Sequence, residues 1–136
     1  RSETTEGGGK LESIEGGCPE GYGDNAMGSI GYWLKDEQDP GKKLSHDEGM
    51  VGACRIGGES DTGACRFYVC LTKSPFLDGN FTLFGKVRTG LDVARKIFQG
   101  EVASEDQGKE GARRAAKPAV IQKVTITQHE TEAKAD

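Results

Sequence analysis

The sequence lacks the features of several large protein classes. It has no apolar run long enough to span a bilayer, no recognisable signal peptide and no excess of positive charge, since its formal net charge is −4. These absences argue against a membrane protein and against nucleic acid as a main partner. The chain also lacks an initiator Met, and we therefore expect a processed product, an excised piece or a fragment of a longer protein.

The cysteines are irregularly spaced. None of the four cysteines forms a C-x-x-C pair, which argues against a zinc site; they are Cys18, Cys54, Cys65 and Cys70. Cys54 and Cys70 fall in apolar runs, where a reduced thiol packs like a small hydrophobic side chain. We expect a reduced cytoplasmic protein without a metal or other cofactor, with one disulfide as the alternative.

Two common catalytic patterns are also missing. The glycine runs are not followed by Lys and then Ser or Thr, so they do not indicate a phosphate-binding loop. His46 lies in a charged loop, and neither His46 nor His129 has a cysteine or serine in a nucleophile context beside it. The sequence therefore gives no support to a nucleotide-binding or hydrolytic enzyme.

Glycine is abundant, with 21 of 136 residues, and favours many turns and short strands. One helix is expected between Thr89, as its capping residue, and Gly100, which ends it. Short strands and one helix together indicate a small β-barrel or sandwich. Residues 1–13 are expected to form a polar, glycine-rich arm or loop, and residues 129–136 a charged tail. Strands are expected at residues 50–54, 66–71, 81–87 and 119–127.

The most informative stretch is residues 67–87, FYVCLTKSPFLDGNFTLFGKV. Its order of FY-V-C, a proline with an aromatic residue, LDG and FGKV resembles the cyclophilins, a family of peptidyl-prolyl cis-trans isomerases. Four further pieces are similar to cyclophilin motifs and occur in the same order, from about Ile14 to Ile126. They are residues 14–19 (IEGGCP), 31–37, 46–55 (HDEGMVGACR) and 90–97.

The resemblance implies a mainly β fold, a cyclophilin-like antiparallel β-barrel with one clear helix, over residues 14–128. The family barrel has eight strands closed by two helices, and the first strands and first helix have no counterpart in this chain. Such a domain is N-terminally incomplete and would expose strand edges. We therefore expect the natural protein to continue upstream of Arg1.

The resemblance also implies how such a site works. Rotation about an X-Pro bond needs a donor to the prolyl nitrogen and an apolar pocket for the ring, without nucleophile, metal or cofactor. In the family the donor is the arginine of an F-H-R motif, which is missing here because Gly7 occupies its position in an ungapped count. Arg1 takes that role if residues 2–12 contain an insertion, and Arg66 is the second candidate.

Two matched positions depart from the family together. Glu15 and Arg66 both stand where the family has glutamine, which suggests a Glu15–Arg66 ion pair across the site. Arg66 is alternatively an exposed strand residue without a role. Arg55 matches the strand end whose backbone pairs with bound peptide. Four residues match the positions that line the proline pocket, with plain core packing as the alternative: Tyr68, Phe76, Leu77 and Phe81.

The function that follows is isomerisation of X-Pro bonds in peptides and folding proteins, weakened or absent in this chain if its donor is missing. The expected partners are proline-containing peptides or unfolded proteins, and the expected state is a monomer without nucleic acid or membrane contacts. The main alternative is a non-catalytic cyclophilin-like module or scaffold that binds proline-containing partners. An unrelated β-domain would require five collinear matches by coincidence.

Overall fold

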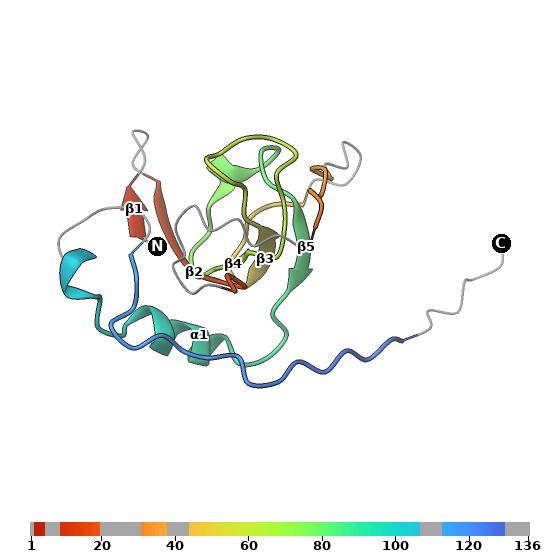
Figure 1. Cartoon of the computed structure of the whole chain (residues 1–136). Coiled ribbons are helices and arrows are strands. Elements are labelled where there is room, and N and C mark those ends of the chain that lie inside the picture. Colours follow the sequence, from red (N-terminus) through yellow and green to blue (C-terminus); the bar gives the residue numbers. More distant parts are fainter. Residues whose placement is uncertain (1, 5–8, 20–30, 38–43, 107–112, 130–136) are drawn as a thin grey trace, which may run out of the picture.

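The computed structural model describes residues 2–4, 9–19, 31–37, 44–106 and 113–129, and its centre is one antiparallel sheet (Figure 1). The five strands lie in the order β1-β2-β4-β3-β5. They are β1 (Ser2–Thr4), β2 (Lys10–Gly16), β3 (Met50–Ala53), β4 (Phe67–Cys70) and β5 (Leu83–Lys86). The helices are α1 (Leu91–Phe98) and two short 3₁₀ turns, η1 (Pro75–Leu77) and η2 (Ser104–Asp106).

Strand β4 is the centre of the sheet and the most buried strand. It pairs with β2 on one side and with β3 on the other, so that Tyr68 lies between Glu15 and Gly52. Its aromatic and β-branched residues suit a strand buried on both sides. The buried apolar residues of the described chain gather around it: Leu11, Tyr68, Val69, Cys70, Leu71 and Ala94.

Helix α1 forms where the sequence indicates, but its cap differs. The N-cap residue is Gly90, in a left-handed conformation with φ of 86°, and it makes no side-chain capping bond. Thr89 was therefore wrong as the capping residue, because the chain enters the helix through a backbone turn that favours glycine. The guanidinium of Arg95 bonds both Glu48 and the carbonyl of Leu71, which ties α1 to the end of β4.

The expectation of an arm or loop over residues 1–13 was wrong for the parts that the structure describes. Residues 2–4 and 10–13 form strands, and Leu11 and Ser13 are buried. Strand β2 forms because β4 supplies a pairing edge from a distant part of the chain, a cause that local composition does not reveal. The predicted domain bounds, 14–128, remain a prediction, and residues 130–136 of the predicted tail lie outside the described residues.

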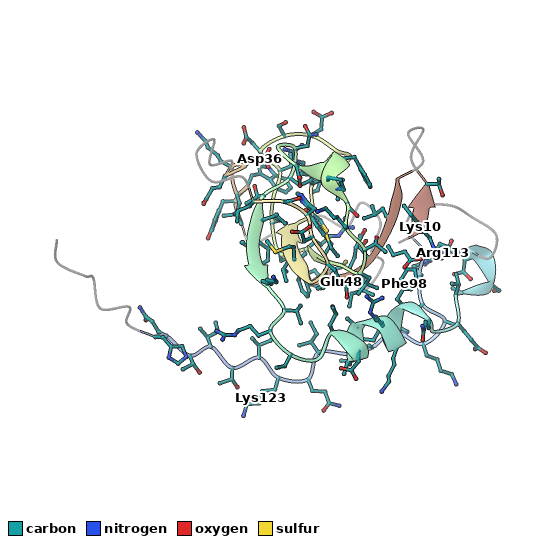
Figure 2. The ribbon with its side chains drawn as sticks, turned by 180° about the vertical axis from the view of Figure 1, so that it is seen from behind. Lys10, Asp36, Glu48, Phe98, Arg113 and Lys123 are labelled. Atoms are coloured by element: carbon teal, nitrogen blue, oxygen red, sulfur yellow. The ribbon has the colours of Figure 1, made fainter. Side chains whose placement is uncertain are left out.

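The expected strand at residues 119–127 was also wrong. This segment has no regular secondary structure. Figure 2 labels Lys123 on it and shows that it lies apart from the strands of the sheet. Its apolar side chains are exposed, with Ile126 91% accessible, because no described strand edge lies beside it. Over the described residues the sheet therefore stays open rather than closing into the expected barrel.

Candidate functional site

The two faces of the sheet carry different residues, because side chains alternate along a strand. Tyr68 points to one face, together with Glu15 and Gly52, its partners in register. Phe67 points to the other, together with its partner Ala53. We call these the Tyr68 face and the Phe67 face.

An aromatic pair forms the centre of the Tyr68 face. The ring of Tyr68 lies across Gly52, where a Cβ atom would be 2.3 Å from the tyrosine oxygen, so only glycine leaves room for it. Phe81 meets Tyr68 edge to face, with 6.2 Å between ring centres. The guanidinium carbon of Arg55 lies 4.9 Å from the centre of the Phe81 ring, a cation–π arrangement.

Arg55 is held in place by a carboxylate. Its Nε and Nη2 atoms donate to the two oxygens of Asp36, with an Nε–Oδ1 distance of 3.2 Å. Both side chains are largely buried, and a two-point contact of this kind fixes the plane of the guanidinium. The backbone amide of Asp61 donates to the same carboxylate, which ties the loop after Arg55 to Asp36.

The predicted ion pair between Glu15 and Arg66 is confirmed. Nη2 of Arg66 donates to Oε2 of Glu15 over 2.9 Å. The pair bridges the ends of β2 and β4, and both side chains are mostly covered, at 13% exposure for Arg66 and 21% for Glu15. Glu15 and Arg66, which both stand where the family has glutamine, thus balance each other's charge.

A hydrogen-bond network centred on the buried His46 adjoins the aromatic pair; it consists of Ser45, His46, Tyr68 and Asp78 and is called the His46 network below. The two ring nitrogens of His46 lie 2.8 Å from the Tyr68 hydroxyl and 2.6 Å from Oδ1 of Asp78. The His46 backbone amide and the Ser45 hydroxyl also donate to Asp78. A carboxylate only accepts, so Nδ1 donates to Asp78, and in the neutral ring Nε2 then accepts from Tyr68.

Burial and this network shift three pKa values. Burial raises the pKa of the Tyr68 hydroxyl far above its ordinary value, and the charge of Asp78 adds a smaller contribution. Burial and the same charge raise the pKa of the Cys70 thiol to about 11. Burial alone would raise the pKa of Asp78, but hydrogen bonds from His46 and Ser45 outweigh it and hold that pKa below its ordinary value. Tyr68 and Cys70 are thus kept neutral and Asp78 ionised.

The other expected site residues lie around this cluster or outside the described residues. Phe76 and Leu77 belong to η1, directly before Asp78, and Phe76 is 36% exposed. Arg1 is the one that lies outside the described residues. The structure thus joins Arg55, Phe81 and Tyr68 by contact, and Glu15 and Arg66 by an ion pair.

Sequence reasoning missed three members of the site. His46, set aside as a residue of a charged loop, is only 1% exposed, and Asp78 and Asp36 were not singled out. Asp78 is part of the L-D-G turn, and an aspartate at a turn commonly accepts local backbone bonds. That signal identifies a turn but not a partner 32 residues away, so the contact with His46 could not be read from it.

An open groove of about 490 Å³ lies beside the sheet and is lined from both faces, by Phe67 and Ala53 of the Phe67 face and by Leu83, the partner of Gly52, of the Tyr68 face. Apolar side chains supply much of its lining, including Leu34, Phe67 and Phe84, and its charged residues are Lys35, Asp36, Glu37 and Arg66. Among the expected site residues that the structure describes, Arg66 alone lines the groove. Within the described part of the chain, no cluster of three or more His, Cys, Asp or Glu residues could hold a metal ion, and no helix could cross a membrane.

Comparison with known proteins gives one consistent result. The profile of the family described as cyclophilin type peptidyl-prolyl cis-trans isomerase/CLD matches residues 8–127. Peptidyl-prolyl cis-trans isomerase B of Bacillus subtilis is 36% identical over 91 residues, which are 67% of this chain and 59% of the relative. A peptidyl-prolyl cis-trans isomerase of Helicobacter pylori is 38% identical over 92 residues, 65% of this chain and 52% of the relative.

A solved structure shares the fold at lower identity. A cyclophilin type peptidyl-prolyl cis-trans isomerase of Cryptosporidium parvum, crystallised in the presence of the dipeptide Ala-Pro, matches with a TM-score of 0.55 and 22% identity. The match covers 76% of this chain and 62% of that protein, so the chain spans little more than half of the relatives it resembles. The five collinear motifs, the mainly β fold and the family match agree: the chain belongs to the cyclophilin-type peptidyl-prolyl cis-trans isomerase family.

Proposed function

We propose that the Tyr68 face binds X-Pro segments of peptides and unfolded proteins and isomerises the X-Pro bond. Family membership supports the reaction, and the Ala-Pro dipeptide present with the related Cryptosporidium parvum protein supports the substrate class. The observation that carries the proposal is the contact of Arg55 with Phe81 and of Phe81 with Tyr68. A rigid aromatic surface with a cation beside it suits a proline ring and its flanking carbonyl groups.

The expected residues then take distinct roles. Tyr68 is 6% exposed and supplies the floor of the pocket, while Phe81 and the more exposed Phe76 supply its walls together with Leu77. The backbone after β3, at Arg55, pairs with the extended peptide. The Asp36 carboxylate holds the Arg55 side chain, so that the peptide meets a fixed surface.

Arg66 is the donor that we propose for the prolyl nitrogen. The rotation barrier of about 18–20 kcal/mol comes from amide resonance, which a hydrogen bond to that nitrogen weakens. A guanidinium has five N–H groups, and the bond to Glu15 engages one of them while fixing its orientation. Arg1 is the second candidate.

The setting that we propose is a cytoplasmic monomer that acts on proline-containing chains without nucleic acid or membrane partners. The spacing of the cysteines and the acidic balance of the sequence support it. Sedimentation of the purified chain would test the monomer, since a mass near twice 14.5 kDa would contradict it.

The test is an NMR exchange assay on a short Ala-Pro peptide, with the chain and with Arg66→Lys, Arg66→Ala and Arg1→Ala. Arg66→Lys keeps the charge but loses the planar donor group. We expect it to lower kcat/KM about a hundredfold while the peptide Kd changes less than about twofold. Arg114→Lys is the matched control, because Arg114 also pairs with carboxylates, Glu105 and Asp106, but on residues outside the site.

Three results would change the proposal. Loss of activity in Arg1→Ala alone would move the donor role to Arg1. Peptide binding without isomerisation by the unaltered chain would make it a binding module. Absence of both binding and isomerisation would reject the proposal.

A further inference from the structure

His46 contacts both ends of the η1 turn. Its backbone carbonyl accepts from the amide of Ser74, the residue before Pro75, over 2.7 Å. Its backbone amide and Nδ1 both donate to Asp78, the residue after Leu77. One residue from a distant loop therefore holds the two ends of the segment that carries Phe76 and Leu77.

The start of the turn is also attached to the sheet through Ser74, whose hydroxyl donates to Thr72, a residue bonded to β2; the contacts of His46 hold the far end of the turn as well. The local backbone bonds, from Leu77 to Ser74, from Asp78 to Pro75 and from Asn80 to Leu77, shape the turn but do not attach it to any strand. Through Nε2, the same histidine reaches Tyr68 of β4. The His46 side chain therefore links the η1 turn, through Asp78, to the central strand, through Tyr68.

The histidine at the centre of the network is buried, whereas Asp78 is 32% exposed. His46 is 1% exposed and Ser74 is fully buried, and no buried side-chain nitrogen or oxygen among the described residues lacks a hydrogen-bond partner. Loss of one member leaves another polar group without a partner away from water, which is unfavourable. The arrangement therefore has one well-defined geometry.

We propose that His46 is a positioning residue of the X-Pro site, which sets Phe76 and Leu77 at a fixed place relative to Tyr68 and Phe81. The inference rests on the proposed function for its effect on peptide binding, and on the contacts of His46 for its effect on the turn. Small displacements of binding groups have large effects, because a proline ring must meet all the pocket walls together.

Two substitutions separate the two links of the histidine. In His46→Asn the amide nitrogen stands near the place of Nδ1, which preserves the bond to Asp78 and removes the bond to Tyr68. In His46→Gln the amide nitrogen stands near the place of Nε2, which preserves the contact with Tyr68 and removes the side-chain bond to Asp78. His46→Asn loses the buried bond to Tyr68 and His46→Gln the partly exposed bond to Asp78, so His46→Asn is expected to lose at least as much stability in urea denaturation.

The two variants differ in what they do to the turn. We expect His46→Gln to raise the Kd for N-acetyl-Ala-Ala-Pro-Phe-amide about tenfold, and His46→Asn less than about threefold. The ¹⁹F resonance of Phe76 in protein labelled with fluorophenylalanine, assigned with Phe76→Leu, should shift or broaden in His46→Gln and stay close to its original position in His46→Asn. Val69→Ala, a core change outside the network, controls for loss of stability alone.

The outcomes distinguish this inference from the proposed function. Equal Kd values for the two histidine variants, or an equal loss of affinity in Val69→Ala, would overturn the positioning role. If the unaltered chain binds no peptide, the proposed function fails, and the Phe76 resonance decides the positioning role by itself. An unchanged Phe76 resonance in His46→Gln would overturn that role in either case.

Discussion

The two faces of the sheet are held together by different kinds of contact. The Tyr68 face is joined by directional contacts: two largely covered ion pairs, a cation–π contact and the His46 network. The Phe67 face borders an open groove, and exposed apolar residues such as Leu34 and Phe84 lie there. Directional contacts fail when geometry changes, whereas apolar contacts depend mainly on area. Outside the buried core, to which Val69 belongs, sensitivity to substitution should therefore be concentrated on the Tyr68 face.

The largest expected effect comes from Gly52→Ala. The added methyl group would overlap the Tyr68 ring and displace it from Phe81 and His46. We expect a loss of about 1–3 kcal/mol in the free energy of unfolding, measured by urea denaturation with circular dichroism. Gly85→Ala is the control on the Phe67 face, since its methyl group would meet Val51 at an ordinary 3.7 Å. Equal stability of the two variants would contradict the comparison.

Asp36→Asn should have the next largest effect. It removes the charge that balances Arg55, whose side chain is 10% exposed, and we expect a loss of about 1–3 kcal/mol. The matched control is Asp47→Asn, because Asp47 and its partner Lys73 are 53% and 68% exposed. An exposed pair of this kind contributes less than about 1 kcal/mol. Thermal melting of both variants would test the difference, and equal shifts in Tm would speak against it.

Acid should weaken the Tyr68 face through Asp78. The folded state lowers the pKa of Asp78, so this group's contribution to stability is complete above the ordinary carboxyl pKa of about 3.9 and is lost as the pH falls through the lower folded value. Asp78→Asn lacks this contribution at every pH. The unfolding free energies of the two proteins should therefore converge on acidification. Ser45 and His46 donate hydrogen bonds to this carboxylate, and its charge raises the pKa values of Tyr68 and Cys70.

Urea denaturation between about pH 6 and pH 2.5 would measure that convergence. Parallel curves for the original chain and Asp78→Asn across the whole range would show that the His46 network does not depend on the charge of Asp78.

The smallest effect is expected from Phe84→Ser on the Phe67 face. Phe84 is 63% exposed, so its replacement should change the unfolding free energy by less than about 0.5 kcal/mol. It should nevertheless lower the fluorescence of the dye ANS, which binds exposed apolar surface. A loss of stability as large as that of Gly52→Ala would show that the groove is part of the folded core.

The sequence predicted the parts of the fold that depend on local chemistry. The strands around Phe67–Cys70 and Leu83–Lys86 and the helix before Gly100 follow from aromatic, β-branched and glycine residues. Strand β2 was missed because its partner β4 lies far along the chain. The segment at residues 119–127 was assigned to a strand from its sequence alone, yet a strand also needs a neighbouring edge.

The residues of the site were likewise predictable from the sequence only in part. The Glu15–Arg66 pair was predictable because two complementary charges replaced two glutamines at matched positions. His46 was not predictable, because a histidine in a charged loop looks the same in sequence whether it is buried or exposed. Only the fold brings it between Tyr68 and Asp78.

The pairing of β2 with β4 also leads to an expectation about the order in which the chain folds. Glu15 and Arg66 are 51 positions apart, and Lys10 and Thr72, which are also bonded, are 62 positions apart. Closing so long a loop loses chain entropy before any contact compensates for it, whereas α1 needs only neighbouring residues. We therefore expect helix α1 to form early and the β2–β4 pairing to limit the folding rate. During that interval the edge of β4 is exposed to pairing with other chains.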